Sequence, residues 1–185
     1  MARIRWLHRL RRPAAVERDH TVFVFSGGSV RGAAQVGMLR VLFENDIIPH
    51  EIVGVSAGAL NGVYLAHDPT LEQVSRLEDL WRDVAEKAPI RGSVIRNVAS
   101  VLRGRSSFDT GDRLRALIAE HVPMDDLAEV SVPCHVGTTD AATGQVTWWT
   151  SGPVVDLLCA STAVPGVLPV VELEDGSRHI DGGVV

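Results

Sequence analysis

From residue 21 onward, short apolar runs alternate with amphipathic stretches. The runs have the length and β-branched content of buried strands, and the stretches between them repeat apolar residues at helical spacing. The pattern predicts strands at 21–26, 52–55, 132–138, 145–150, 168–173 and 178–180, and helices at 33–45, 57–66, 70–87, 111–121 and 154–160. Alternation of strands and helices predicts an α/β fold with a mostly parallel sheet.

Local signals mark some ends of these elements. Thr70 stands where an N-cap is expected before the helix at 70–87. Asp175-Gly176 suits a tight hairpin turn between the last two strands. Residues 88–110 contain Pro89, two glycines and several arginines, which interrupt a weak helix at 93–102 and indicate a surface segment or lid.

Composition narrows the class of protein. With 185 residues, 45% of them hydrophobic and 22% charged, the chain can bury one sizeable core, and we expect a single domain over 21–185. The net charge of −5 argues against a general nucleic-acid binder, which needs a basic surface. Cys134 and Cys159 lack metal-ligand spacing and predict buried thiols in a reducing compartment. We therefore expect a cytoplasmic protein.

The first 20 residues form a basic arm. Arginines surround Ile4, Trp6, Leu7 and Leu10, so a short amphipathic helix ending at Pro13 is possible here. One interpretation is a solvated arm of the kind common at chain termini. The other is that residues 1–12 contact an anionic membrane surface, which makes such a membrane a candidate partner.

The stretch Gly54-Val55-Ser56-Ala57-Gly58 has the form GxSxG between a predicted strand and a predicted helix. In hydrolases this pattern builds a sharp turn that exposes a serine hydroxyl at a helix N-terminus. The pattern by itself is weak, and a small-residue turn with a capping serine is the alternative. A catalytic serine also needs a base and an oxyanion site, and none of the seven histidines stands in a context that marks a base.

Another glycine-rich turn, SGGSVRG at 26–32, follows the first strand and suits the binding of an anion. A nucleotide phosphate is poorly supported as that anion. The P-loop pattern needs Lys and Ser or Thr after Gly32, where Ala33-Ala34 stand, and Ser29 breaks the dinucleotide fingerprint. The oxyanion of a reaction intermediate is the remaining candidate.

Taken in order, the segments FSGGSVRGAAQVGMLRVL, GVSAGALNG, ASTAVPGVLPVV and HIDGG resemble the blocks of the patatin-like phospholipase family over about residues 21–185. The resemblance implies a three-layer α/β sandwich with a mostly parallel central sheet. It also implies hydrolysis of lipid acyl esters, with a lipid as partner and with neither metal nor cofactor.

The resemblance carries roles to individual positions. Ser56 matches the family's nucleophile, and Asp181 matches its partner in a Ser–Asp dyad that needs no histidine. Gly27, Gly28 and Ser29 match the loop whose N–H groups bind the oxyanion. The positions that match its supporting framework are Arg31, Gly32, Gly54, Gly58, Gly182 and Gly183.

Two departures from the family pattern are visible. Ser29 stands where the family usually has glycine, so a positive φ there would store about 1–3 kcal/mol of strain. The chain ends at Val185, two residues after Gly183, so we expect a domain that is incomplete at its C-terminal end and an Asp181 that is poorly held.

Two alternatives stay open. An α/β-hydrolase triad in the chain order Ser56, Asp140, His179 is possible, although it leaves SGGSVRG and DGG unexplained. A non-catalytic relative that keeps the fold is the other, given Ser29 and the chain end.

Overall fold

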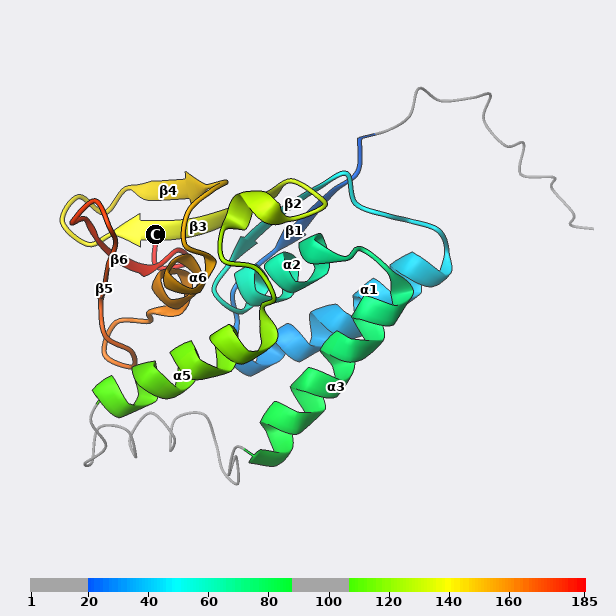
Figure 1. The fold of residues 1–185 in the computed structure, drawn as a ribbon, viewed down its shortest axis with the longest axis horizontal. Helices are drawn as coiled ribbons and strands as arrows, with labels where there is room; N and C mark the ends of the chain where they lie inside the picture. Colours follow the sequence, from blue (N-terminus) through cyan, green and yellow to red (C-terminus); the bar gives the residue numbers. More distant parts are fainter. Residues whose placement is uncertain (1–19, 88–106) are drawn as a thin grey trace, which may run out of the picture.

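The computed structural model describes residues 20–87 and 107–185 (Figure 1). The basic arm and the weak helix predicted at 93–102 lie outside these residues, so the predictions for them remain predictions. Within the described ranges, no helix has the length and apolar character needed to cross a membrane.

The described strands form one sheet in the order β1-β2-β3-β6-β5, with β4 paired to β3. β1 and β2 pair in parallel, as do β2 and β3, whereas β4, β5 and β6 join by antiparallel pairing. The strands are β1 (Val22–Phe25), β2 (Glu51–Val55), β3 (Cys134–Asp140), β4 (Val146–Trp149), β5 (Val171–Glu172) and β6 (Arg178–Asp181). All six were predicted, with ends that differ by a few residues.

The predicted helices are also present. They are α1 (Gly32–Glu44), α2 (Ala57–His67), α3 (Leu71–Lys87), α5 (Ser107–His121) and α6 (Val154–Thr162), with short 3₁₀ turns at Ser29–Arg31 and Leu127–Glu129. Thr70 caps α3 as expected, because its hydroxyl accepts a hydrogen bond from the Gln73 N–H at 3.1 Å. α5 begins four residues before the predicted start, and the two 3₁₀ turns carry no sequence signal strong enough to predict.

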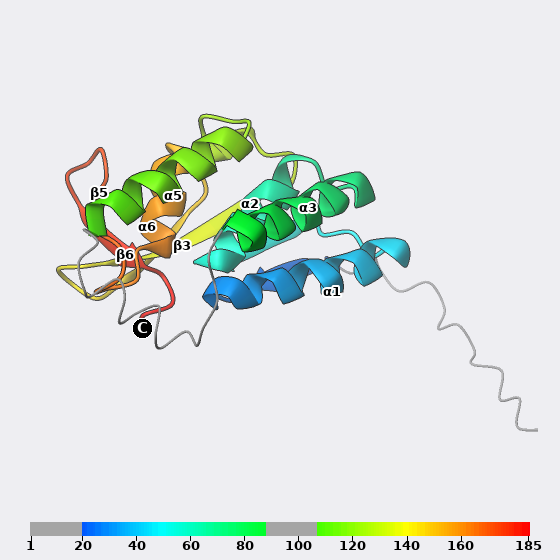
Figure 2. The same cartoon turned by 90° about the horizontal axis from the view of Figure 1, so that it is seen from below.

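The layers follow from which face of each strand is apolar. Phe23, Phe25, Ile52 and Val136 share one face of the sheet and are buried. α2 and α6 pack on this face, and α3 and α5 lie on the side of them away from the sheet (Figures 1 and 2). The α/β class is confirmed.

The opposite face of the sheet carries Val24, Val53, His135, Gly137 and Trp148. Val24 is 74% exposed and Trp148 is 50% exposed. Among the described residues, no helix covers this face, since the helices that Figure 1 draws lie on the other side.

Strand register brings two strand ends together. Val136 pairs with both Gly54 and Trp149, and Thr138 pairs with both Thr147 and Asp181. A residue pairs with one strand on each side, so β4 occupies one edge of β3 while β2 and β6 share the other. β2 runs parallel to β3 and β6 antiparallel, so their carboxyl ends meet at Gly137-Thr138.

Candidate active site

Ser56 occupies a sharp turn between β2 and α2. Its φ of 55° and ψ of −129° lie outside the regions that side chains other than glycine normally adopt. The positions two residues before and after Ser56 require glycine, because a Cβ at either would collide with neighbouring backbone. A Cβ at Gly54 would lie 2.6 Å from the Gly58 carbonyl oxygen, and one at Gly58 would lie 2.3 Å from the Phe25 carbonyl oxygen. The turn predicted from GxSxG is therefore present.

The glycine-rich loop follows β1 and lies against Ser56. A Cβ at Gly27 would lie 3.1 Å from the Ser56 Cβ and 3.7 Å from its Oγ. Gly28 has φ 156° and Ser29 has φ 53°, after which a 3₁₀ turn leads through Arg31 into α1 at Gly32. Ser29 thus adopts the positive φ that was expected to strain a residue other than glycine at this position, at a cost of about 1–3 kcal/mol.

Asp181 ends β6 and is 4% exposed. Its N–H donates to the Ala163 carbonyl oxygen at 3.0 Å, and its Oδ1 accepts from the Gly183 N–H at 2.8 Å. A Cβ at Gly182 would lie 2.2 Å from the Gly137 carbonyl oxygen, so only glycine fits there. Asp181 is therefore firmly held, in contrast to the expectation from the sequence.

The register places Ser56 and Asp181 at the junction of β2 and β6, along the same edge of β3 beside Gly137-Thr138. Within the described residues, no hydrogen bond joins Ser56 Oγ to Asp181, and Oδ2 of Asp181 accepts none. Hydrogen bonds of catalytic groups are often long before substrate binds, so this geometry leaves Oδ2 available to the serine hydroxyl.

The residues of the alternative triad are occupied elsewhere. Asp140 Oδ1 accepts hydrogen bonds from the N–H and the hydroxyl of Thr143 and from the N–H of Ala142, which lower the pKa of this carboxyl. The carboxylate thus stabilises the turn between β3 and β4. The buried His179 lies 2.9 Å from Thr138 Oγ1 through Nδ1 and 2.9 Å from Ser177 Oγ through Nε2. Both ring nitrogens have partners, and neither partner is Ser56 or Asp140.

Two polar residues that sequence reasoning missed support the site. Asn61 is 1% exposed, donates to the Gly32 carbonyl oxygen at 3.0 Å, and accepts from the Trp81 indole N–H at 2.8 Å. It therefore joins α2 to the start of α1 and to α3. Ser161 Oγ accepts from the Ser56 N–H at 2.9 Å. A polar residue in an apolar helix was the available signal for Asn61.

The cysteines are free buried thiols. Burial raises the pKa of Cys134 to about 12. Burial, offset in part by Arg115, raises the pKa of Cys159 to about 11. Both thiols are protonated at neutral pH, so neither is a reactive thiolate.

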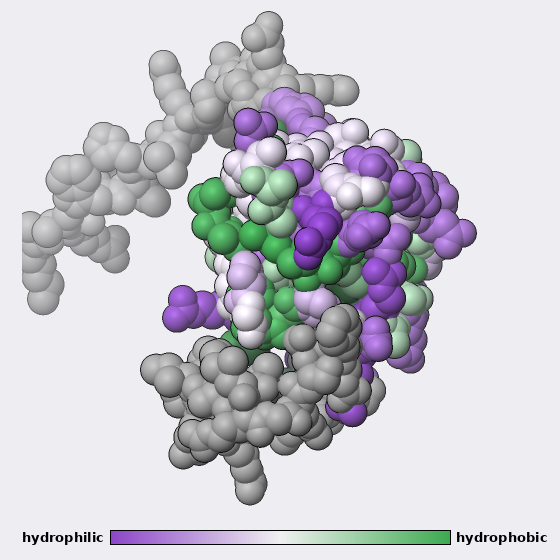
Figure 3. Space-filling view, turned by 90° about the vertical axis from the view of Figure 1, so that its left-hand side faces the viewer, coloured by the Kyte–Doolittle hydropathy of each residue, from purple (hydrophilic) through white to green (hydrophobic). Residues whose placement is uncertain are grey.

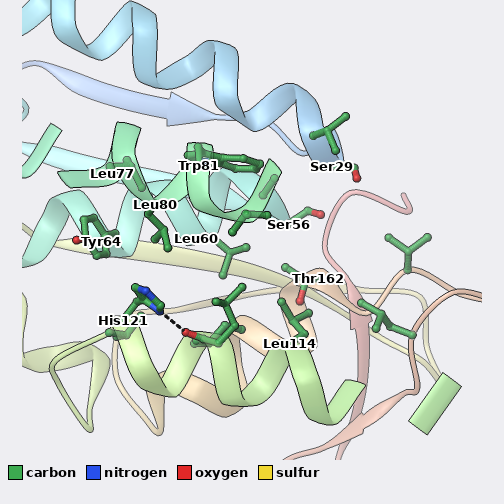
Figure 4. Close-up of a pocket in the computed structure, with 18 of the residues that line it drawn as sticks. Ser29, Ser56, Leu60, Tyr64, Leu77, Leu80, Trp81, Leu114, His121 and Thr162 are labelled. Carbon is green, nitrogen blue, oxygen red and sulfur yellow. Dashed lines mark hydrogen bonds between the residues drawn. The ribbon is translucent and has the colours of Figure 1, made fainter. Parts of the chain in front are cut away.

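A pocket of about 320 Å³ opens beside Ser56 and runs between α2, α3 and α5 (Figure 4). Ser29 and Ser56 lie at one end, and Tyr64 and His121 lie at the other. Burial raises the pKa of Tyr64. His121 Nδ1 lies 2.9 Å from the Leu117 carbonyl oxygen. Between the two ends the lining is mainly apolar, including Leu60, Leu77, Leu80, Trp81, Leu114 and Ile118.

The outside of the molecule near the strand ends is partly apolar. Figure 3 views the molecule from the left-hand side of Figure 1 and shows apolar residues gathered across the middle of this face, between polar ones. Val30 and Val164, which line the pocket, are 47% and 41% exposed.

Comparison with known proteins identifies relatives of the whole described domain. The family model for patatin-like phospholipase matches residues 23–185. Patatin-like phospholipase domain-containing protein ZK370.4 of Caenorhabditis elegans is 28% identical to this chain over 163 residues. Patatin-like phospholipase domain-containing protein 7 of Rattus norvegicus is 26% identical over 163 residues. Lysophospholipase nte1 of Aspergillus terreus is 26% identical over 162.

Each alignment covers 88% of this chain but only 10–12% of the relative, so the chain spans about a tenth of their length. Among solved structures, VipD from Legionella pneumophila superposes with a TM-score of 0.61 at 14% identity, covering 89% of this chain and 46% of VipD. That likeness concerns the fold. The fold, the order of the motifs and the match over residues 23–185 agree, and the chain belongs to the patatin-like phospholipase family.

Proposed function

We propose that this chain hydrolyses the acyl esters of lipids, with Ser56 as nucleophile and Asp181 as base. One observation carries the proposal: Ser56 stands in a strained turn at the end of a mainly apolar pocket, beside the meeting point of β2 and β6. The strain fits a nucleophile, because strained backbones persist where the surrounding structure fixes them and concentrate at active sites.

The proposed reaction proceeds in two steps. Ser56 Oγ attacks the ester carbonyl carbon while Asp181 Oδ2 takes the hydroxyl proton. Asp181 returns this proton to the leaving alcohol as the C–O bond breaks, which leaves an acyl group on Ser56. A water molecule then attacks the acyl carbon, gives its proton to Asp181, and the Ser56–acyl bond breaks with return of the proton to Ser56 Oγ.

The oxyanion that forms in each step needs donors in place. The N–H groups of Gly27, Gly28 and Ser29 are the proposed donors in the loop beside Ser56. The N–H of Ala57 is a further proposed donor, because the first N–H groups of a helix have no acceptor within it, and this one lies at the positive end of α2.

The pocket favours a substrate with one acyl chain. Its volume of about 320 Å³ is at the lower end of the ~300–1,000 Å³ of small-molecule sites, and its lining is apolar along its length. A lysophospholipid or another monoacyl ester fits this description. The name of the Aspergillus terreus relative, lysophospholipase nte1, supports the same class.

Labelling with a fluorophosphonate tests the nucleophile. We expect wild-type protein to be labelled at Ser56, and Ser56→Ala protein, shown to be folded by circular dichroism, to remain unlabelled. Folded wild-type protein that takes up no label would favour the non-catalytic alternative.

A pair of substitutions tests the base. Asp181→Asn should lower kcat for a monoacyl ester by about 10³-fold or more, because the serine loses its proton acceptor. His179→Ala should keep most of the turnover at a temperature where both variants are folded. The opposite ranking would support the triad of Ser56, Asp140 and His179.

The proposed peripheral contact with a membrane rests on residues 1–12 and their arginines. Removal of residues 1–12 should reduce co-sedimentation with vesicles that contain anionic lipid, while hydrolysis of a short soluble ester stays unchanged. Equal sedimentation of the two proteins would end this part of the proposal.

A further inference from the structure

Ser161 lies at the end of α6, far from Ser56 in sequence, and is fully buried. Its hydroxyl makes two hydrogen bonds at the junction of β2 and β6. Oγ accepts from the Ser56 N–H at 2.9 Å and donates to the Gly137 carbonyl oxygen at 2.7 Å. One hydroxyl therefore connects the backbone of the proposed nucleophile to β3, the strand along whose edge β2 and β6 meet.

The same segment also holds the proposed base. Two residues after Ser161, the Ala163 carbonyl oxygen accepts the Asp181 N–H at 3.0 Å. Residues 161–163 thus bind the backbone of both members of the proposed dyad. Neighbouring Thr162 differs, because its hydroxyl donates to carbonyl oxygens of α6 itself, those of Leu158 and Cys159.

The bond to Ser161 acts where the backbone is strained. Ser56 has φ 55° and ψ −129°, and its N–H is at the beginning of a helix, where N–H groups lack intrahelical acceptors. Ser161 supplies that acceptor inside the protein. An N–H buried here without an acceptor would destabilise the turn, because it would lose its hydrogen bonds to water and gain none within the protein.

We propose that Ser161 is a positioning residue for hydrolysis: its hydroxyl fixes the Ser56 backbone relative to Gly137, and through the Ala163 carbonyl the same segment fixes Asp181. The inference rests on the proposed roles of Ser56 and Asp181. Because the Ser56 N–H is bound to Ser161, it is unavailable to the oxyanion, and the proposed donors remain the N–H groups of the loop at Gly27, Gly28 and Ser29 together with that of Ala57.

Substitution at Ser161 separates positioning from a general loss of stability. Ser161→Ala should lower kcat for a soluble monoacyl ester by about ten- to a hundredfold with little change in KM, because small displacements of reacting groups have effects of this size. Ser161→Thr keeps the hydroxyl and should recover most of kcat. Rates are measured where circular dichroism shows each variant to be folded.

Thr139→Val is the matched control. Thr139 is buried in β3, and its hydroxyl has no hydrogen-bond partner among the described residues. Its removal tests the effect of deleting a buried hydroxyl nearby, and kcat should remain within about twofold of wild type, since no bond is lost. Ser161→Ala and Thr139→Val proteins with equal kcat would overturn the proposal, as would Ser161→Thr protein as slow as Ser161→Ala.

Hydrogen exchange of the wild-type protein gives a test that does not depend on how variants fold. The Ser56 amide should exchange much more slowly than those of Ala57 and Gly58, which have no acceptor within α2. Equal exchange at the three amides would overturn the proposal. Failure of the proposed function has a different signature: wild-type protein would hydrolyse nothing, or Ser56→Ala would keep the activity.

Discussion

Two strand-to-helix turns lie side by side at the carboxyl ends of β1 and β2, and each contains a serine with positive φ. Ser56 follows β2 with φ 55°, and Ser29 follows β1 with φ 53°. Ser56 is buried, and its N–H is bound to Ser161. Ser29 is exposed.

The surroundings of the two turns differ as much as their exposure. The turn at Ser56 is fixed by glycines that have no room for a Cβ, and Gly58 touches the backbone of Phe25, where the loop of Ser29 begins. The loop of Ser29 is held locally by the Arg31 N–H, which donates to the Gly28 carbonyl oxygen at 3.0 Å, and at its ends by Gly27 packed against Ser56 and by Asn61, which donates to the Gly32 carbonyl oxygen. Similar φ values therefore occur in one turn that is buried and in another whose serine is exposed.

Gly58→Ala should have the largest effect, because it pushes the two turns apart. The new Cβ would lie 2.3 Å from the Phe25 carbonyl oxygen, and backbone on both sides leaves little freedom to move. We expect the free energy of unfolding, measured by urea denaturation, to fall by about 3 kcal/mol or more. Gly37→Ala in α1 is the control: a Cβ there meets nothing within 4 Å, and stability should rise by about 0.5–1 kcal/mol.

Ser56→Gly should separate strain from activity in the buried turn. Glycine accepts the backbone angles of Ser56, so the free energy of unfolding should rise by about 1 kcal/mol relative to Ser56→Ala. Both variants lack the hydroxyl, and kcat should fall below about a thousandth of wild type. A Ser56→Gly protein less stable than Ser56→Ala would show that the turn is not strained.

Gly28→Ala should affect activity more than stability, because Gly28 is exposed and has φ 156°. A Cβ there would lie 3.3 Å from the Arg31 Cβ, so the loop has to shift its N–H groups. We expect kcat for a soluble ester to fall by about ten- to a hundredfold, less than for complete loss of an oxyanion donor. Unchanged kcat would place the oxyanion donors outside this loop.

Ser29→Gly should have the smallest effect. It relieves the left-handed strain in the exposed turn and should raise the free energy of unfolding by up to about 1 kcal/mol. The N–H of residue 29 stays in place, so kcat should remain within about threefold of wild type. Ser29→Ala keeps the Cβ and serves as the control, with no gain in stability. A tenfold change in kcat for Ser29→Gly would mean that the Ser29 hydroxyl itself takes part.

The elements were predictable from local sequence because their signals are local. Apolar runs marked all six strands, Thr70 marked the start of α3, and GxSxG marked the turn at Ser56. Asp181 was different, since an aspartate before two glycines is common in turns. Only the resemblance to the patatin-like family gave it a role.

The contacts that join distant segments could not be predicted in this way. Ser161 and Ser56 are 105 residues apart, and nothing near Ser161 in the sequence indicates its bond to the Ser56 N–H. The sequence predicted where the helices occur but not which face of the sheet they cover. The described helices lie on one face and leave Val24 and Trp148 exposed on the other.

The sequence by itself determined the alternation of strands and helices, the glycines that allow two tight turns, and the family. Those features depend on residue size, backbone freedom and periodicity, which act over a few residues. Only the tertiary structure decided that β2 and β6 share one edge of β3 and meet end to end at Gly137-Thr138. That meeting depends on register between strands far apart in the chain, and it is what brings Ser56, Asp181 and Ser161 to one place.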